Sequence, residues 1–230
     1  LAYSNLKRQK AAVRDFSRAI ELNPSDADFY FNRAYSLDEL GDKKRAIDDY
    51  TRAIELNADH DLAYYNRALL YEVRGKPDLA VLDYSKAIEI NSKDTQAHIN
   101  RGYLYEERGD YESALKDFTK AVELSPEDPD TYSGRGYVFD SLGELDKAIA
   151  DFDRALEINP NDDAIYYNRA NSFYKKGDYE RALEDYDKAI ELNPEDACNY
   201  LRRAEVYEKL GEREKAKADR RKYEKLSGGK

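Results

Sequence analysis

The sequence predicts an all-α protein, an α-solenoid of stacked antiparallel helix hairpins. Three observations predict it: a glycine recurs every 34 residues, an alanine follows each glycine at one fixed distance, and no insertion disturbs this register. Repetition of this kind is typical of a repeat architecture and not of a domain with one central core. The glycines are Gly41, Gly75, Gly109, Gly143, Gly177 and Gly211. The alanines are Ala46, Ala80, Ala114, Ala148, Ala182 and Ala216.

Each repeat is expected to contain two helices. In the repeat that starts at residue 27, Tyr30, Ala34 and Leu37 fall at helical spacing and form one apolar stripe before Gly41 ends the helix. A second stripe after the glycine consists of Ala46, Tyr50, Ala53 and Ile54. Small alanines let two helices approach closely, and the aromatic side chains fill the space between them. A single hairpin cannot bury both faces, so the hairpins must stack on one another.

This pattern resembles the tetratricopeptide repeat, through its period, the aromatic at Tyr30, the alanines, and a proline that closes most units. The resemblance implies a right-handed superhelix, with the first helix of each hairpin lining a concave groove that binds peptides or partner proteins. It divides the chain into a partial first repeat at 1–26, repeats at 27–60, 61–94, 95–128, 129–162 and 163–196, and a last repeat at 197–230. The final helix carries Lys217, Arg220 and Glu224 at apolar positions, which is typical of a solvent-facing cap.

Two charged columns depart from the usual pattern of the family. The first helices carry Arg33, Arg67, Arg101, Arg135, Arg169 and Arg203, and the second helices carry Asp15, Asp49, Asp83, Asp117, Asp151, Asp185 and Asp219. We expect a ladder of partly buried ion pairs, because the planar guanidinium matches a carboxylate. The alternative is a row of arginines that binds a ligand.

Composition narrows the class of partner. The formal net charge is −10, acidic and basic residues alternate along the chain, and the only locally basic stretch is near the end, so nucleic-acid binding is not expected. The 21 tyrosines argue against disorder. Cys198 is the only cysteine, which suits a reducing compartment, and no apolar run could span a membrane. These features favour a cytoplasmic protein, although the chain does not begin with methionine and a targeting segment could precede it.

The resemblance places one polar column on the groove. An asparagine amide offers both a donor and an acceptor, so it can bind the backbone of an extended peptide. The alternative is that these asparagines satisfy local backbone groups or hold the superhelix together. The column consists of Asn32, Asn66, Asn100, Gly134, Asn168 and Arg202.

Neighbouring columns would give selectivity, since aromatic side chains with a polar tip are favoured at recognition surfaces. One aromatic and apolar column holds Phe31, Tyr65, Ile99, Tyr167 and Leu201, and another holds Tyr35, Leu69, Tyr103 and Tyr137. An acidic column holds Asp38, Glu72, Glu106, Asp140 and Glu208, interrupted by Tyr174. These acids predict a partner of basic or mixed polarity.

Some members of the family hold the C-terminal carboxylate of chaperones with lysines and asparagines. The corresponding lysine positions here hold other residues, so a chaperone tail is not the expected partner. They are Phe31, Tyr65 and Ile99 in one column, and Asp28, Leu62, Gln96, Asp130, Ala164 and Cys198 in the other.

No pattern predicts catalysis, a cofactor or a metal. His60 and His98 lie in different repeats without a further ligand at suitable spacing, and His98 occupies a tyrosine position of the repeat. The leading hypothesis is a non-enzymatic scaffold that binds an extended segment. The alternatives are the substrate-recruiting arm of a larger enzyme, and a protein that self-associates through its first repeat, where "LAYSNLKRQ" would be the remainder of a leading helix.

Overall fold

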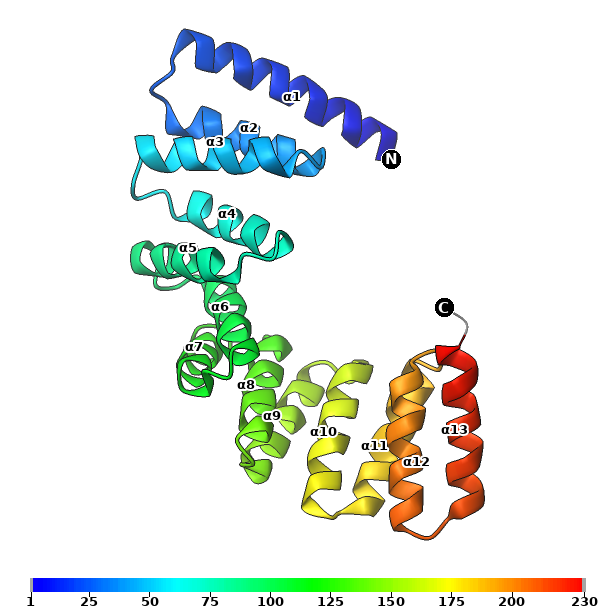
Figure 1. Cartoon of the computed structure of the whole chain (residues 1–230). Helices are drawn as coiled ribbons and strands as arrows, with labels where there is room; N and C mark the ends of the chain where they lie inside the picture. The colour runs from blue at the N-terminus through cyan, green and yellow to red at the C-terminus, as the bar shows by residue number, and fades with distance from the viewer. Residues whose placement is uncertain (1, 229–230) are drawn as a thin grey trace. The chain divides into compact units, whose positions relative to one another are not determined.

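The computed structural model describes residues 2–228, with side chains described over residues 6–228. The described part of the chain forms thirteen α-helices and no strand, so the all-α prediction is confirmed (Figure 1). In the first half these are α1 (Ala2–Leu22), α2 (Ala27–Glu39), α3 (Lys43–Leu56), α4 (Asp61–Val73), α5 (Pro77–Ile90) and α6 (Thr95–Glu107). In the second half they are α7 (Tyr111–Leu124), α8 (Pro129–Ser141), α9 (Leu145–Ile158), α10 (Asp163–Lys176), α11 (Tyr179–Leu192), α12 (Ala197–Lys209) and α13 (Arg213–Ser227).

The chain forms two compact units, which meet in sequence between Leu104 and Tyr105. Within the first unit, α2 packs on α3 and α4 packs on α5 as antiparallel hairpins, and α3 also packs on α4 (Figure 1). The second unit repeats this arrangement with the pairs α8–α9, α10–α11 and α12–α13, which are joined by α9–α10 and α11–α12 contacts. Each unit is therefore a stack of helix hairpins, as the repeat predicts.

The recurring glycine makes the turn within each hairpin. Gly41 has a φ of 80°, in the left-handed region that only glycine adopts at low cost. Its N–H donates to the Asp38 carbonyl at 2.7 Å, and the Asp42 N–H donates to the Leu37 carbonyl at 2.9 Å. The Asp42 side chain then accepts from the Arg45 N–H at the start of α3. These bonds satisfy carbonyl and N–H groups that helix ends leave unpaired.

The predicted alanines and aromatics form the core. On second helices the residues Ala46, Ala80, Ala114, Ala148 and Ala182 are fully buried. The aromatic side chains that pack beside them, Tyr50, Tyr84, Phe118, Phe152 and Tyr186, are fully buried as well. A buried aromatic ring contributes about 2 kcal/mol or more through the apolar surface it removes from water. The small and large residues of the repeat thus have the packing roles that their spacing predicts.

The first repeat differs from the expectation. Residues 2–22 form one continuous helix, α1, so the prediction of a separate helical remainder before a second helix is wrong. The reason is the residue at the turn position, which is Lys7 where the other repeats carry glycine. A lysine does not readily adopt the left-handed conformation that ends the leading helix elsewhere, so the helix runs on.

The predicted arginine–aspartate ladder is present. Arg67 of α4 donates from Nε to Oδ2 of Asp83 at 2.7 Å and from Nη2 to Oδ1 at 2.8 Å, so the first and second helices of one hairpin are joined by a bidentate pair. The Arg67 and Asp83 side chains are only 14% and 8% exposed. The pairs Arg33–Asp49, Arg135–Asp151, Arg169–Asp185 and Arg203–Asp219 repeat the same contact.

Five arginines of the ladder also bond to the helix that precedes their own hairpin. The remaining Nη1 of Arg67 donates to Oγ1 of Thr51 on α3 at 2.9 Å. The Arg67 guanidinium also lies 5.7 Å from the ring centroids of both Tyr64 and Tyr71. In other repeats the acceptor at the position of Thr51 is Ser17, Ser85, Asp153 or Asp187. These guanidinium donors are directed at neighbouring helices, which argues against the alternative of a ligand-binding arginine row.

Candidate functional site

Each unit by itself carries a candidate site, the surface of its first helices, which are α2, α4 and α6 in the first unit and α8, α10 and α12 in the second. The column of Phe31, Tyr65 and Tyr167 does not project freely from this surface. The Phe31, Tyr65 and Tyr167 rings pack at centroid distances of 5.7, 5.6 and 5.9 Å on the buried second-helix rings of Tyr50, Tyr84 and Tyr186, respectively. Their position is therefore fixed by the core beneath them, and each ring keeps a half-buried face.

The asparagine column is divided in its contacts. The Asn32 amide donates to the Asp28 carbonyl of its own helix at 2.7 Å. The Asn100 amide donates to the hydroxyls of Tyr65 and Tyr84, both at 3.2 Å. Asn32 thus satisfies a backbone group of its own helix, and Asn100 bonds to side chains of the hairpin before its own, so these two amides have partners within the protein. Within residues 6–228 the amides of Asn66 and Asn168 have no hydrogen-bond partner, so they retain both a donor and an acceptor for a ligand.

The second aromatic column is exposed at its three tyrosines. Tyr35 on α2 and Tyr103 on α6, both in the first unit, are 50% and 39% exposed. Tyr137 on α8 in the second unit is 42% exposed. Burial raises the pKa of Tyr137, so its hydroxyl stays protonated and can donate. These rings present apolar faces to solvent from an ordered helix, an arrangement common at binding surfaces.

The acidic column is partly neutralised by the protein itself. Glu72 accepts a hydrogen bond from the buried Tyr84 hydroxyl, and Glu208 accepts from Arg220 at 2.9 Å. Burial raises the pKa values of Asp38 and Glu106, and neither has an ion-pair partner among the residues that the structure describes. Those two carboxylates are the members of the column that remain available to a basic partner.

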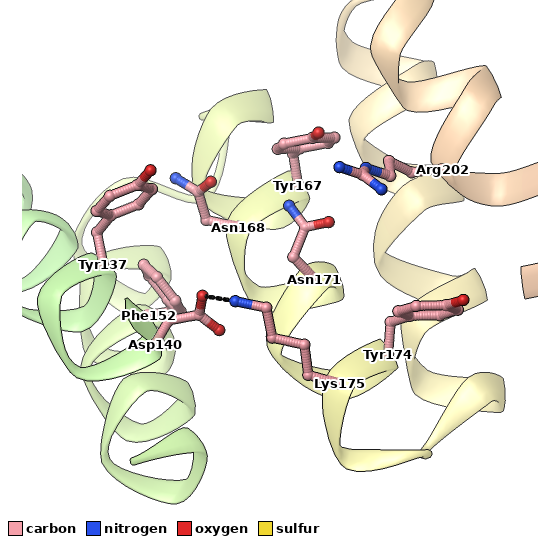
Figure 2. Close-up of a pocket in the computed structure, with 9 residues that line it drawn as sticks. All are labelled: Tyr137, Asp140, Phe152, Tyr167, Asn168, Asn171, Tyr174, Lys175 and Arg202. Atoms are coloured by element: carbon pink, nitrogen blue, oxygen red, sulfur yellow. Dashed lines mark hydrogen bonds and ion pairs between the residues drawn. The ribbon is translucent and has the colours of Figure 1, made fainter. Parts of the chain in front are cut away.

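The second unit contains a cavity of about 320 Å³ on this surface (Figure 2). Three successive first helices line it: Tyr137 and Asp140 come from α8, several side chains from α10, and Arg202 from α12. The buried Phe152 of α9 also contributes. The α10 residues that line the cavity are Tyr167, Asn168, Asn171, Tyr174 and Lys175.

Asp140 lies deep in this cavity, with only 11% of its side chain exposed. The buried Ser172 hydroxyl donates to Asp140 Oδ1 at 2.7 Å. Lys175 forms an ion pair with Oδ2 (Figure 2). The acid predicted to attract a basic ligand is therefore already paired with a lysine from the next hairpin.

Arg202 lies at the opposite side of the cavity from Asp140, and its guanidinium points toward Tyr167 and Asn171 (Figure 2). Hydrogen bonding to the Tyr167 hydroxyl and to Glu205 raises its pKa, so it is cationic at every physiological pH. The Nη1–Glu205 Oε2 distance is 3.0 Å, and almost half of the Arg202 side chain is exposed. The guanidinium is held in place but not enclosed.

The repeat columns do not predict Asn171, Ser172 or Lys175 as site residues, and Tyr174 enters them only as an interruption of the acidic column. For Asn171 and Tyr174, the sequence does contain an indication, because both depart from their repeat columns. Asn171 stands where Tyr35, Tyr103 and Tyr137 stand in other repeats, and Tyr174 stands where those repeats have an acid. In a chain of close repeats, such departures on one surface point to a specific local role.

His60, the next candidate, has contacts typical of a structural role. His60 begins α4, and its Nδ1 accepts from the Ala63 N–H at 3.3 Å, while its ring packs 4.6 Å from Phe31. Among residues 6–228 there is no cluster of histidine, cysteine and acidic side chains suited to a metal ion. The described helices also include none with both the length and the apolar character needed to cross a membrane.

Comparison with protein families finds the tetratricopeptide repeat at residues 27–60, 62–94, 95–128 and 164–196. A TPR repeat model matches residues 136–177, and another tetratricopeptide repeat model matches residues 1–26. A comparison with curated proteins finds no match.

Several solved structures are similar to this chain. YrrB, described as a TPR protein with an unusual peptide-binding site, is 29% identical with a TM-score of 0.72, over 80% of this chain and 95% of YrrB. The Pseudomonas aeruginosa protein pilF is 22% identical with a TM-score of 0.74, over 89% of this chain and 93% of pilF. A tetratricopeptide repeat protein from Parabacteroides merdae is 23% identical with a TM-score of 0.71, over 98% of this chain and 90% of that protein. The latter two show a shared fold.

Proposed function

Because the chain belongs to the tetratricopeptide repeat family, we propose that it is a protein-interaction scaffold whose first helices bind an extended partner segment. Repeat surfaces of this kind bind through side chains presented by many successive helices. The likeness to YrrB, a protein described by its peptide-binding site, supports a peptide as the class of ligand. No reaction is part of this proposal.

The observation that carries the proposal is the exposure of Tyr35, Tyr103 and Tyr137 at equivalent places on their helices. A tyrosine that is two-fifths to one-half exposed on a rigid helix offers a large contact area at little entropic cost. The unpaired amides of Asn66 and Asn168 lie on other first helices, α4 and α10, which carry Leu69 and Asn171 at the tyrosine position, and they supply backbone recognition. Apolar contact and backbone hydrogen bonds together favour an extended segment over a folded surface.

We propose a partner segment of mixed polarity. In the first unit, Asp38 provides an acid without an ion-pair partner among the described residues, which suits a lysine or arginine of the segment. Because Asp140 in the second unit is paired with Lys175, the same argument does not extend to the cavity. The attraction between exposed charges should weaken as salt is added.

A selection from a displayed library of random linear peptides tests the proposal. The wild-type chain should enrich a family of related peptides, and the triple variant Tyr35→Ala, Tyr103→Ala, Tyr137→Ala should not, while both keep the same helical circular dichroism. A matched control is Leu82→Ala, which removes a side chain that is 63% exposed from the second helix α5. Enrichment of the same peptides by the triple variant would show that the first-helix tyrosines are not the binding surface.

A further inference from the structure

Three departures from the repeat pattern meet at the cavity of the second unit. Asn171 replaces a tyrosine of the exposed column, Tyr174 replaces an acid, and Arg202 replaces an asparagine. Each change lies on α10 or α12, and all three side chains line the same space (Figure 2). The backbone of the hairpins is set by the repeated residues, so these changes alter the surface chemistry without altering the fold.

The strongest hydrogen-bond acceptor in this cavity is already occupied. Asp140 accepts from the Ser172 hydroxyl at one oxygen and from Lys175 at the other. The Asn171 carbonyl oxygen, Oδ1, accepts from the buried Tyr186 hydroxyl at 2.7 Å. A lysine or arginine from a bound segment would have to compete with Lys175 for Asp140 in order to pair here.

Hydrogen-bond donors, in contrast, remain available. Because Tyr186 fixes the Asn171 amide through Oδ1, the Nδ2 group of Asn171 keeps its two N–H donors. Arg202 has five N–H donors, and Glu205 and the Tyr167 hydroxyl account for part of this set. The guanidinium remains almost half exposed on the cavity side. The cavity therefore combines a cation with oriented amide donors beside three tyrosine rings.

We infer that this cavity receives an acidic side chain of the bound segment, with its carboxylate hydrogen-bonded by Arg202 and Asn171. The inference rests on the proposed function, because it names the residue class that one subsite of the surface selects. A carboxylate matches the planar guanidinium fork better than a neutral carbonyl does, and a charge-assisted bond is about twice as strong as a neutral one. The Tyr137, Tyr167 and Tyr174 rings then contact the apolar neighbours of that acid.

The test is a peptide selection with three proteins: wild type, Arg202→Gln, and the control Arg221→Gln, which removes an exposed arginine of α13. Wild type and Arg221→Gln should enrich peptides with a shared aspartate or glutamate next to apolar residues. Arg202→Gln should lose that preference while it keeps the wild-type melting temperature. One selected peptide and its Glu→Gln or Asp→Asn version are then compared on wild type by fluorescence anisotropy, and the neutral version should bind about tenfold more weakly.

The outcomes separate the two proposals. Failure of wild type to enrich any peptide family overturns the proposed function and this inference together. Enriched peptides with lysine or arginine at the shared position, or with no shared acid, leave the scaffold function standing and overturn the acidic subsite. Equal binding of the acidic and neutral peptides to wild type has the same effect, and that comparison needs no protein variant to fold.

Discussion

Arg33 and Asp49 are sixteen residues apart, on α2 and α3, and meet through two parallel hydrogen bonds of 2.6 and 2.8 Å. The third guanidinium nitrogen of Arg33 reaches back to the Ser17 hydroxyl of α1 at 3.1 Å. One side chain thus joins three consecutive helices, and Arg67, Arg169 and Arg203 do the same in later hairpins. Register between hairpins is therefore defined by directional bonds as well as by packing of alanine and aromatic side chains.

Removing one partner of such a pair should be costly. Arg67→Ala leaves the Asp83 carboxylate, which is 8% exposed, without its partner, and we expect a loss of about 3 kcal/mol in the free energy of unfolding. The double variant Arg67→Met, Asp83→Leu should recover most of this loss, because it removes the desolvated charges together. Urea unfolding of the three proteins measures the effect. If the double variant is as unstable as Arg67→Ala, the pair contributes true stability and our interpretation of it as a register device is wrong.

Most of the fold could be predicted from the sequence, since each repeat restates the same helix stripes, turn glycine and core alanines. Two features could not. The bond from Arg67 to Thr51 uses a position filled by serine, threonine or aspartate in different repeats, so no single residue type marks the column. The continuity of α1 depends on one residue, Lys7 at a glycine position, and not on the repeated residues that define the helix stripes.

The candidate site was less predictable than the fold. Sequence columns identified surface positions but not which side chains were already bonded, because those partners come from helices far away in the chain. Asn100 bonds to Tyr65 and Tyr84, whereas Asn66 at the same repeat position bonds to nothing described. The acid Asp140 has a partner, Lys175, that is thirty-five residues away in sequence. Such pairs form only where two hairpins pack on each other, so the repeat columns alone do not predict them.

Asn199 on α12 is a site where one substitution should stabilise the protein. Its side chain is fully buried, and within the described residues neither its Oδ1 nor its Nδ2 has a hydrogen-bond partner. An unsatisfied buried amide costs about 1–3 kcal/mol. Asn199→Leu keeps a similar branched shape and removes both polar atoms, so the free energy of unfolding should rise by about 1 kcal/mol or more. Thermal unfolding measures this, with Asn161→Leu in the exposed α9–α10 loop as the control. A lower melting temperature for Asn199→Leu than for wild type would contradict the prediction.

Gly134 interrupts the asparagine column for a steric reason. A Cβ atom at this position would lie 2.2 Å from Cε1 of Phe118, a fully buried ring. Gly134→Ala should therefore lower the free energy of unfolding by about 1–3 kcal/mol through overpacking. In a Phe118→Leu background the same glycine substitution should cost less, because the smaller side chain frees the space. A double-mutant cycle with chemical unfolding gives the coupling energy, and a cycle with no coupling would refute the steric explanation.

The carboxylate of Asp38 predicts a pH dependence. Burial has the largest effect and raises the pKa of Asp38. The nearby Lys43 lowers this pKa by a smaller amount, and Glu39 raises it further. A raised pKa means that the folded state holds the proton more tightly, so stability falls as the pH rises from the ordinary aspartate value of about 3.9 through the raised value. Asp38→Asn lacks this loss and should be more stable than wild type at pH 7, by less than about 1 kcal/mol. The difference should vanish near pH 3, with Asp59→Asn in an exposed loop as the control. A difference that grows on acidification would have the wrong sign.

The asparagine column separates binding from folding within a single residue type. Asn66→Ala removes an amide without a described partner, so the variant should have the same melting temperature as wild type. Its affinity for a selected peptide should fall by roughly tenfold, because a pair of hydrogen bonds to the peptide backbone is lost. Asn100→Ala removes the donor shared by the Tyr65 and Tyr84 hydroxyls, so it should lower the free energy of unfolding by about 1 kcal/mol. Anisotropy titration and thermal unfolding of both variants distinguish the two roles. If Asn66→Ala changes stability and leaves peptide affinity unchanged, its amide is structural like that of Asn100, and the groove depends on its tyrosines alone.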